Sequence, residues 1–235
     1  MNQILLFPED YISRTKALLK GRRFDHLVSV LKARKGDYLR AGIAGDLMGE
    51  ALVTELYHDH AVIEPRFTEE PPPPLPLTLI LAMPRPKSLR KALHYAAAMG
   101  VKKIFLIRTW RVEKSYFDTP LLEEENLRRE LVLAMEQARD TVLPEVYVKT
   151  LFRPFAEDEL PALAEGSLKL IAHPESRLRC PRDVRGPVTL VVGPEGGFVD
   201  FELSLLESLG FLRVSLGERV LRVENAVPAL IGRLF

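Results

Sequence analysis

The stretch Leu190-Val191-Val192-Gly193-Pro194-Glu195-Gly196-Gly197 joins a short apolar run directly to a glycine-rich turn. Asp200 and Glu202 follow the turn and begin a helical pattern. The turn comes after what we predict to be the next-to-last strand of its domain, whereas a dinucleotide-binding turn of the doubly wound kind follows the first strand. The order of the elements therefore separates this turn from the common cofactor motif.

The composition of the turn limits its chemistry. It lacks a Lys followed by Ser or Thr, so it cannot supply the ammonium and the magnesium-binding hydroxyl of a nucleoside triphosphate loop. Gly196 and Gly197 leave backbone exposed at the carboxyl end of a buried strand, where open α/β sheets bind ligands. Taken alone, a purely structural turn explains these glycines equally well. An ordinary first-strand cofactor site is disfavoured because residues 82–87 contain no glycine.

Strands and helices alternate along the chain from residue 77 onward. Short apolar runs predict strands at residues 77–83, 103–107, 146–150, 168–172, 188–192 and 213–216. Apolar residues at helical spacing predict helices at residues 87–99, 121–139, 157–164 and 201–209, and a last helix with Val227, Leu230, Ile231 and Leu234 facing inward. This alternation predicts an α/β fold, with a mostly parallel sheet and helices on both faces.

A proline-rich stretch at residues 71–76 marks the expected domain linker, because consecutive prolines hold the backbone extended and remove hydrogen-bond donors. We predict a small, mostly-β domain over residues 1–70 and the α/β domain over residues 77–235. In the small domain we expect strands at residues 38–43, 48–56 and 61–64, and a helix over residues 24–33 that buries Phe24, Leu27, Val28 and Leu31.

The composition excludes several classes of protein. No stretch approaches the roughly 18 uncharged apolar residues of a membrane span, and the first residues lack the pattern of a signal peptide, so we predict a cytoplasmic protein. The single cysteine, Cys180, excludes an internal disulfide. The five histidines show no metal-ligand spacing, and we therefore predict no metal.

The net charge of +1 hides two basic segments, one between Arg14 and Arg40 and one between Arg85 and Lys114. Acidic residues are concentrated elsewhere, notably at Glu123-Glu124-Glu125. A protein that coats nucleic acid indiscriminately is disfavoured by the low net charge, but an enzyme with a specific RNA substrate fits the distribution. Exposed faces solvated by long basic side chains are the structural alternative.

A second glycine-containing loop, Ser215–Ala226, follows the last predicted strand and is closed by a helix. Its pattern Leu216-Gly217-x-Arg219-Val220-Leu221-Arg222-x-Glu224-x-Ala226, together with the first turn and Glu202, resembles the two signature loops of the RsmE group of SPOUT methyltransferases in order and spacing. The resemblance extends to the N-terminal region, where His26-x-x-x-Val30-Leu31-Lys32 followed by Gly36-Asp37 is similar to the first module of that family.

The resemblance implies a fold and a cofactor. The C-terminal segment is expected to thread through a preceding loop as a deep trefoil knot, a rare exception among chain topologies, and the small domain to be a PUA-like barrel. S-adenosylmethionine is expected to bind between three loops. The residues expected to bind it are Ala172, His173, Gly193, Pro194, Glu195, Gly196, Gly197, Leu216, Gly217, Val220 and Leu221. A homodimer that packs through the last helix is implied, although an intramolecular contact explains the apolar stripe of that helix equally well.

The reaction implied by the resemblance is methylation of uridine N3 in 16S ribosomal RNA of the small subunit. The N3 proton must leave, and protein donors should stabilise the charge that accumulates on the flanking carbonyl oxygens. Arg222 is the candidate donor because it is always charged, and an ion pair with Glu224 is its structural alternative. Glu224 either accepts the proton or orients Arg222. Glu195 either contacts substrate or caps the next helix, and for Glu202 we expect capping.

The basic segments become candidate RNA-binding surfaces once the resemblance is taken into account. The residues expected to contact RNA phosphates are Arg14, Arg22, Arg23, Lys32, Arg34, Lys87, Arg90 and Lys91. Two other functions stay open, because Val223 and Asn225 stand where the family usually has Thr or another small hydroxyl residue. One is a SPOUT methyltransferase with a different RNA target, and the other is a catalytically silent RNA-binding relative in ribosome assembly.

Overall fold

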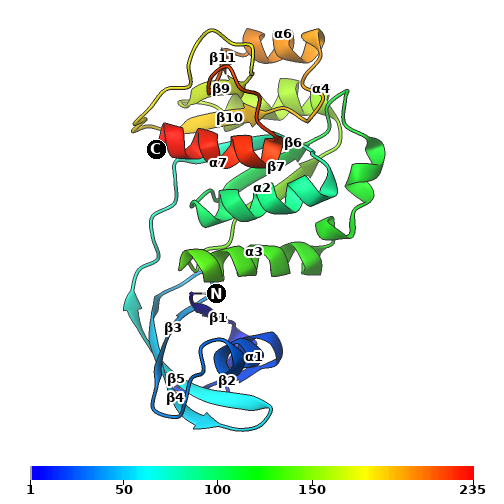
Figure 1. The fold of residues 1–235 in the computed structure, drawn as a ribbon. Helices are drawn as coiled ribbons and strands as arrows, with labels where there is room; N and C mark the ends of the chain where they lie inside the picture. Colours follow the sequence, from blue (N-terminus) through cyan, green and yellow to red (C-terminus); the bar gives the residue numbers. More distant parts are fainter. Residues whose placement is uncertain (1) are drawn as a thin grey trace. The chain divides into compact units, whose positions relative to one another are not determined.

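The computed structural model describes residues 2–235 and separates them into two units (Figure 1). The first unit comprises the chain up to Pro73 together with Val132–Leu143, and the second comprises Pro74–Leu131 together with Pro144–Phe235. The chain therefore passes between the units at the prolines and again at both ends of residues 132–143. This division differs from the expected one, which assigned the whole of residues 77–235 to one domain.

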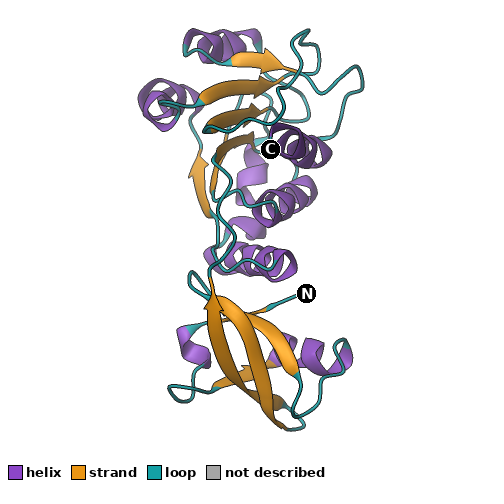
Figure 2. Ribbon diagram, turned by 90° about the vertical axis from the view of Figure 1, so that its left-hand side faces the viewer, coloured by secondary structure: helices purple, strands orange, loops and turns teal. Residues whose placement is uncertain are grey.

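The first unit is built on a five-stranded, barrel-like sheet with the order β1-β3-β4-β5-β2 (Figure 2). β1 pairs with β3 in parallel, and all other neighbouring strands are antiparallel. The strands are β1 (Ile4–Leu6), β2 (Ala17–Lys20), β3 (Tyr38–Ile43), β4 (Met48–Leu56) and β5 (His60–Glu69). A short turn of 3-10 helix, η1 (Pro8–Asp10), and helix α1 (Gly21–Ser29) complete the unit.

Two details of the first unit depart from the sequence pattern. β1 and β2 are not predicted from it, because runs of three or four residues carry too little periodicity to distinguish a strand. Helix α1 ends at Ser29, and the predicted burial of Val28 and Leu31 is wrong, since their side chains are 40% and 46% exposed. Lys32 has a φ of +52°, a left-handed conformation that a helix extending to residue 33 does not allow.

The carboxylate of Glu136 explains why residues 132–143 belong to the first unit. Its side chain is fully buried, and its Oε1 accepts a hydrogen bond of 3.3 Å from the backbone N–H of Leu5. Its Oε2 lies 2.8 Å from the guanidinium of Arg22 on α1. A buried carboxylate is stable only where such partners compensate the loss of water, so the segment and the barrel-like sheet stabilise one another.

The second unit contains a six-stranded sheet with the order β11-β9-β10-β6-β7-β8, in which every pair of neighbours is parallel. The strands are β6 (Leu77–Ala82), β7 (Lys103–Ile107), β8 (Glu145–Lys149), β9 (Leu168–Ala172), β10 (Val188–Val192) and β11 (Leu212–Val214). All five residues of β10 are buried. The predicted α/β fold with a parallel sheet is confirmed.

Helices in several lengths follow the strands of the second unit. They are α2 (Pro86–Ala98), α3 (Glu124–Ala138), α4 (Phe152–Pro154), α5 (Leu160–Leu163), α6 (Asp200–Ser208) and α7 (Val223–Leu234), with the short helical turns η2 (Lys114–Asp118), η3 (Pro120–Leu122) and η4 (Phe155–Glu159). The part of α3 from Val132 onward belongs to the first unit. The helix predicted at residues 157–164 is present over residues 157–163, but it starts earlier, at Phe152, and contains the π-helical turn η4. Pro161 has no backbone N–H, so it interrupts the regular ladder of hydrogen bonds there.

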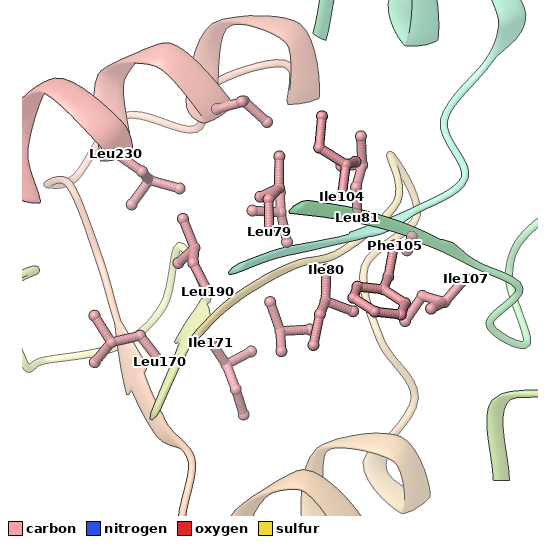
Figure 3. Packing of buried hydrophobic residues seen from close by; sticks show 14 of the residues in the cluster. Leu79, Ile80, Leu81, Ile104, Phe105, Ile107, Leu170, Ile171, Leu190 and Leu230 are labelled. Atoms are coloured by element: carbon pink, nitrogen blue, oxygen red, sulfur yellow. The ribbon is translucent and has the colours of Figure 1, made fainter. Parts of the chain in front are cut away.

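The core of the second unit lies on both faces of its sheet (Figure 3). Leu79 points toward the face where Leu230 of α7 lies, whereas Ile80 and Phe105 point toward the other face. On that second face the ring of Phe105 lies 5.6 Å from the ring of Phe155. Burying an aliphatic or aromatic side chain contributes about 1.5–3 kcal/mol, so this packing holds the strands rigidly and fixes where their carboxyl ends lie.

Candidate functional site

Three loops meet at one edge of the parallel sheet. β11, β9 and β10 are neighbours, and all three run in the same direction, so the loops that follow them emerge side by side. The loop after β9 lies along the end of β11, because the N–H of His173 donates to the carbonyl of Val214 at 2.9 Å. Two further backbone bonds of 2.9 Å join Ser215 to Leu178 and to Cys180. Segments distant in sequence are thus hydrogen-bonded together at this edge.

The turn after β10 has a backbone that requires glycine. Gly197 has a φ of +70°, and its N–H donates to the carbonyl of Pro194 at 2.9 Å. At Gly193 an added Cβ would lie 3.0 Å from the buried ring of Phe198. Glu195 and Gly196 are exposed, whereas Pro194 is buried. The turn therefore presents backbone on its outer side and packs closely on its inner side.

The loop after β7 holds this turn in place. Arg111 donates from Nη1 to the carbonyl of Gly196 at 2.6 Å, and its aliphatic carbons would lie 3.3 Å from a Cβ at Gly196. The buried carboxylate of Glu202 accepts a 2.6 Å hydrogen bond from the N–H of Trp110 and one of 3.0 Å from the N–H of Val199. The capping role expected for Glu202 is confirmed, and the same side chain also fixes the neighbouring loop.

Glu195 contacts the loop after β6. Its Oε1 accepts a 3.1 Å hydrogen bond from the backbone N–H of Arg85. Because Glu202 satisfies the start of α6, Glu195 is not needed to cap that helix. The side chain of Arg85 interacts with Tyr116, which raises the pKa of Arg85 above its usual value. The exposed Glu195 is part of the glycine turn and therefore joins this turn to the loop after β6 that contains Arg85.

The loop after β11 is much more open than the turn after β10. Ser215 at its start is buried, and Leu216 and Gly217 are half-buried. Beyond them Val220 is 77% exposed and Leu221 is 41% exposed. Arg222 is also exposed and forms the N-terminal cap position of α7. Of the predicted cofactor-binding residues of this loop, Val220 and Leu221 thus have exposed apolar side chains, whereas Leu216 packs against the core.

Glu224 is buried where α7 packs against α2. A hydrogen bond with its own backbone N–H, and another with Ser88 of α2, hold the pKa of Glu224 below its usual value. The positive charges of Lys91 and Arg222 act in the same direction. A carboxylate with a lowered pKa is a weak proton acceptor, so the geometry favours an orienting role for Glu224 over that of a general base.

The site offers a fit for a polar small molecule. Nδ1 of His173 is buried without a hydrogen-bond partner, at the point where β9 ends beside Ala172. Exposed backbone at Gly196 and the uncovered apolar residues of the second loop surround the same edge. A ligand with a hydrogen-bonding head and apolar parts would satisfy both kinds of surface. Within residues 2–235 no group of three or more His, Cys, Asp or Glu side chains is placed to hold a metal ion.

The basic residues predicted to contact RNA are of two kinds in the structure. Arg23 is held by Asp10 at 2.5 and 2.6 Å and is only partly exposed, and Arg22 pairs with the buried Glu136. These two side chains therefore have structural partners inside the first unit. The other residues, Arg14, Lys32 and Arg34 in the first unit and Lys87, Arg90 and Lys91 on α2, have exposed side chains. Arg22 is also exposed, and Arg90 lies 3.4 Å from the carboxylate of Glu130.

Sequence patterns do not reveal Trp110, Arg111 and Ser88 as members of this edge. Arg111 contacts a residue 85 positions away, and Trp110 one that is 92 positions away, so only the fold brings them together. A pattern that could have indicated Trp110 and Arg111 is Arg108-Thr109-Trp110-Arg111, a polar and aromatic run directly after the apolar strand β7. Such a run lies at the ligand-binding edge of a parallel sheet.

Comparison with known proteins identifies the family to which this chain belongs. The chain matches the RNA methyltransferase domain family over residues 71–234. It is 33% identical to ribosomal RNA small subunit methyltransferase E of Treponema pallidum, over 96% of this chain and 88% of that protein. A Legionella pneumophila protein in complex with S-adenosylmethionine is 26% identical with a TM-score of 0.76, over 98% of this chain and 95% of that one.

A second solved structure supports the fold alone. Ribosomal RNA small subunit methyltransferase E of Neisseria gonorrhoeae, bound to S-adenosylmethionine, has a TM-score of 0.72 at 22% identity. The alignment covers 98% of this chain and 95% of that one. Both units are therefore present in the related structures.

In residues 2–235 no helix has the length and apolar character to cross a membrane.

Proposed function

The chain belongs to the RsmE family of ribosomal RNA small subunit methyltransferases, and we propose that it transfers a methyl group from S-adenosylmethionine to N3 of a uridine in 16S ribosomal RNA. The observation that carries this proposal is the meeting of three loops at the carboxyl ends of β9, β10 and β11. An enzyme of this class needs one site that holds the methyl donor beside a second surface for RNA.

The three loops would bind S-adenosylmethionine, which supplies an electrophilic methyl group on its sulfonium. The backbone of the turn from Gly193 to Gly197, including Pro194 and Glu195, would hydrogen-bond the polar parts of the molecule. Ala172, Leu216, Gly217, Val220 and Leu221 would cover its apolar parts, and Nδ1 of His173 would gain the partner that it lacks in the free chain. Burial of Val220 and Leu221 would add a favourable hydrophobic contribution.

Arg222 would stabilise the reacting uridine. As the N3 proton leaves, negative charge spreads to the two flanking carbonyl oxygens, and a guanidinium can donate to them without losing its own proton. The N3 proton would pass to water, and the deprotonated N3 would accept the methyl group that S-adenosylmethionine supplies, with the neutral thioether as the leaving group. Glu224, ionised and tied to Ser88, would hold Arg222 near the start of α7 through their opposite charges. This assigns Arg222 a catalytic role and Glu224 a positioning role.

The exposed basic residues of each unit would bind the RNA backbone. Arg14, Lys32 and Arg34 lie in the first unit, and Lys87, Arg90 and Lys91 lie on α2. Phosphate contacts position the RNA without selecting its sequence, so they suit a protein that must bring one unpaired base to the site. Arg22 and Arg23 would act indirectly, through the pairs that hold α1.

Three further features are part of the same proposal. The C-terminal segment would be threaded as a deep trefoil knot, which the backbone bonds between the loop after β9 and Ser215 support. Two copies would pair through α7, whose residues Pro228, Ala229 and Gly232 line a hollow with Arg182 and Phe235. The protein would act in the cytoplasm, where ribosomal subunits are modified.

Transfer of a tritium-labelled methyl group tests this function. The purified protein is incubated with undermethylated small subunits, with naked ribosomal RNA and with transfer RNA. The proposal expects label in small-subunit RNA, at N3 of a uridine after nuclease digestion. Label in transfer RNA would indicate a different target. No label in any RNA would refute the proposed reaction, and the absence of heat on titration with S-adenosylmethionine would then favour a silent RNA-binding relative with a closed pocket.

A further inference from the structure

Trp110 is the most exposed large apolar side chain in residues 2–235, with 83% of its surface accessible. It is also the only tryptophan of the chain. It lies in the loop after β7, at the same edge of the sheet as the glycine turn, since β7 is parallel to β6 and β6 to β10. Exposure of so large an aromatic ring beside a candidate active site needs a physical reason.

The backbone of Trp110 is fixed, although its side chain is free of the core. Its N–H donates to the buried Glu202 at 2.6 Å, and the next residue, Arg111, hydrogen-bonds Gly196 at 2.6 Å. Both anchors are independent of the indole ring, because they use the backbone of residue 110 and the side chain of residue 111. The ring is therefore displayed from a rigid support rather than required by the packing of the loop.

Basic residues close to Trp110 in the chain and in the neighbouring loop favour a negatively charged partner with aromatic faces. Arg108 and Arg111 flank it two positions before and one position after in sequence, and Arg85 lies in the loop that contacts Glu195. Cationic side chains beside an exposed aromatic ring are the combination by which proteins bind unpaired nucleic acid, through phosphate contacts and stacking on bases.

We propose that Trp110 stacks on an unpaired base of the RNA substrate and so helps to hold the single-stranded region open beside the methyl donor. This inference rests on the proposed RNA methyltransferase function and adds a residue to it. N3 lies on the pairing edge of uridine, so the target region must be unpaired during the reaction. A ring held at the edge of the site offers a stacking surface for the target base or its neighbour.

The single tryptophan allows a direct test by its own fluorescence. The full-length protein is titrated with a twelve-nucleotide oligouridylate, and separately with a duplex of the same strand and oligoadenylate. Stacking predicts quenching of the tryptophan emission by the single strand and much weaker quenching by the duplex. A change of emission on dilution of the protein without RNA would show that a second copy covers Trp110, and this result would overturn the proposal.

Variants extend the test to the reaction. Trp110→Ala is expected to lower kcat/KM for undermethylated small subunits by roughly 5- to 150-fold, the range measured for loss of base stacking, with Trp110→Phe within about threefold of the wild type. Affinity for S-adenosylmethionine should stay within about twofold, because the anchors of the loop use other atoms. Leu212→Ala, which removes an exposed apolar side chain from the start of β11, serves as the control.

The outcomes separate this inference from the proposed function. If the wild type methylates RNA and Trp110→Ala does so equally well, the inference fails and the function stands. If the wild type methylates no RNA but its emission is quenched by the single strand alone, the function fails and the stacking role stands. A Trp110→Ala variant that loses affinity for S-adenosylmethionine as much as activity would also overturn the inference, since its effect would then be structural.

Discussion

The two glycine-containing loops of the site differ in how completely the folded chain defines them. The turn from Gly193 to Gly197 packs against Phe198 on one side and Arg111 on the other, and its neighbour Glu202 is buried and doubly hydrogen-bonded. The loop from Leu216 to Arg222 exposes most of its side chains, Val220 above all. One loop is thus preformed by the protein, and the other needs a ligand or a partner to cover it.

Because of this difference, we expect the two loops to have different roles in the site. A preformed backbone turn costs little ordering entropy on binding and can fix the position of a small molecule. An open loop can close over that molecule and bring its charged end, Arg222, to the substrate. The proposed cofactor role therefore belongs mainly to the first loop and the proposed chemical role to the second.

The largest effect is expected at the open loop. Arg222→Ala should lower kcat by about 10²- to 10³-fold, because it removes a donor to the charge that develops on the uridine carbonyls. Affinity for S-adenosylmethionine should change little, since Arg222 lies beyond the residues proposed to cover the cofactor. Methyl transfer at saturating RNA and calorimetric titration with the cofactor measure the two quantities.

Arg222→Lys is the matched variant, since it keeps the charge but loses the forked donor geometry. It should recover only part of the lost kcat. Normal kcat in Arg222→Ala would remove the catalytic role from this residue. Equal losses of cofactor affinity and kcat would mean that the loop from Leu216 to Arg222 binds the cofactor in the same way as the turn from Gly193 to Gly197.

The next effect is expected in the preformed turn. Gly193→Ala places a Cβ about 3.0 Å from the buried Phe198 ring, which must shift. Overpacking of this kind costs about 1–3 kcal/mol, and displacement of the turn should weaken binding of S-adenosylmethionine by about tenfold or more. Thermal unfolding and cofactor titration check the two effects.

Gly186→Ala provides the control for this substitution. Gly186 has no atoms within 4 Å of an added Cβ, and its φ is not positive. It should leave both stability and cofactor affinity close to those of the wild type. If both variants behave alike, close packing of the turn has no part in binding.

A third prediction concerns the carboxylate that joins α6 to the loop after β7. Glu202→Ala leaves the N–H groups of Trp110 and Val199 without their acceptor and should cost about 1–3 kcal/mol of stability. Glu207→Ala on the same helix removes an exposed carboxylate paired with Arg213 and should cost clearly less stability than Glu202→Ala, because water screens an exposed ion pair. Chemical denaturation measures the free energy of unfolding of the two variants. Equal losses would show that Glu202 does not stabilise the contact between α6 and the loop after β7.

The smallest effect is expected from the pH dependence of Glu224. Its pKa is lowered in the folded chain, so its contribution to stability is present above the unfolded pKa of about 4.3 and is lost as the pH falls through the folded value. The difference in Tm between the wild type and Glu224→Gln should therefore shrink on acidification from pH 7 to pH 3.5. Ser88→Ala should reproduce part of this behaviour, and a difference that grows with acidity would contradict the assignment.

The sequence allowed the main architecture of the second unit to be predicted, because its central strands are continuous apolar runs bounded by turns. Residues 103–107, 168–172 and 188–192 form strands with the predicted bounds. The family to which the resemblance pointed is confirmed by the domain match over residues 71–234 together with the 33% identity to the Treponema pallidum enzyme. Buried parallel strands have a strong local pattern, and the glycine turn is held in a conformation that only certain residues adopt.

Sequence patterns of this kind do not predict contacts between loops. The short strands β1 and β2, the end of α1 and the position of residues 132–143 depend on tertiary partners such as Glu136 with Leu5. In the same way, the polar and aromatic run that contains Trp110 and Arg111 indicates the ligand-binding edge of the sheet, but not the contacts that these residues make with Glu202 and Gly196. The assigned roles of the predicted cofactor-binding and RNA-binding residues stay predictions until variants are measured.

Hydrogen exchange with and without S-adenosylmethionine tests the central claim most directly, that three strand ends of one parallel sheet form the cofactor site. We predict new protection of backbone amides at residues 173–180, 193–197 and 216–222. The gain should be largest in residues 216–222, because that loop is the most open in the free chain. Residues 2–69 should show no change. Protection confined to other parts of the chain, or absent at saturating cofactor, would contradict it.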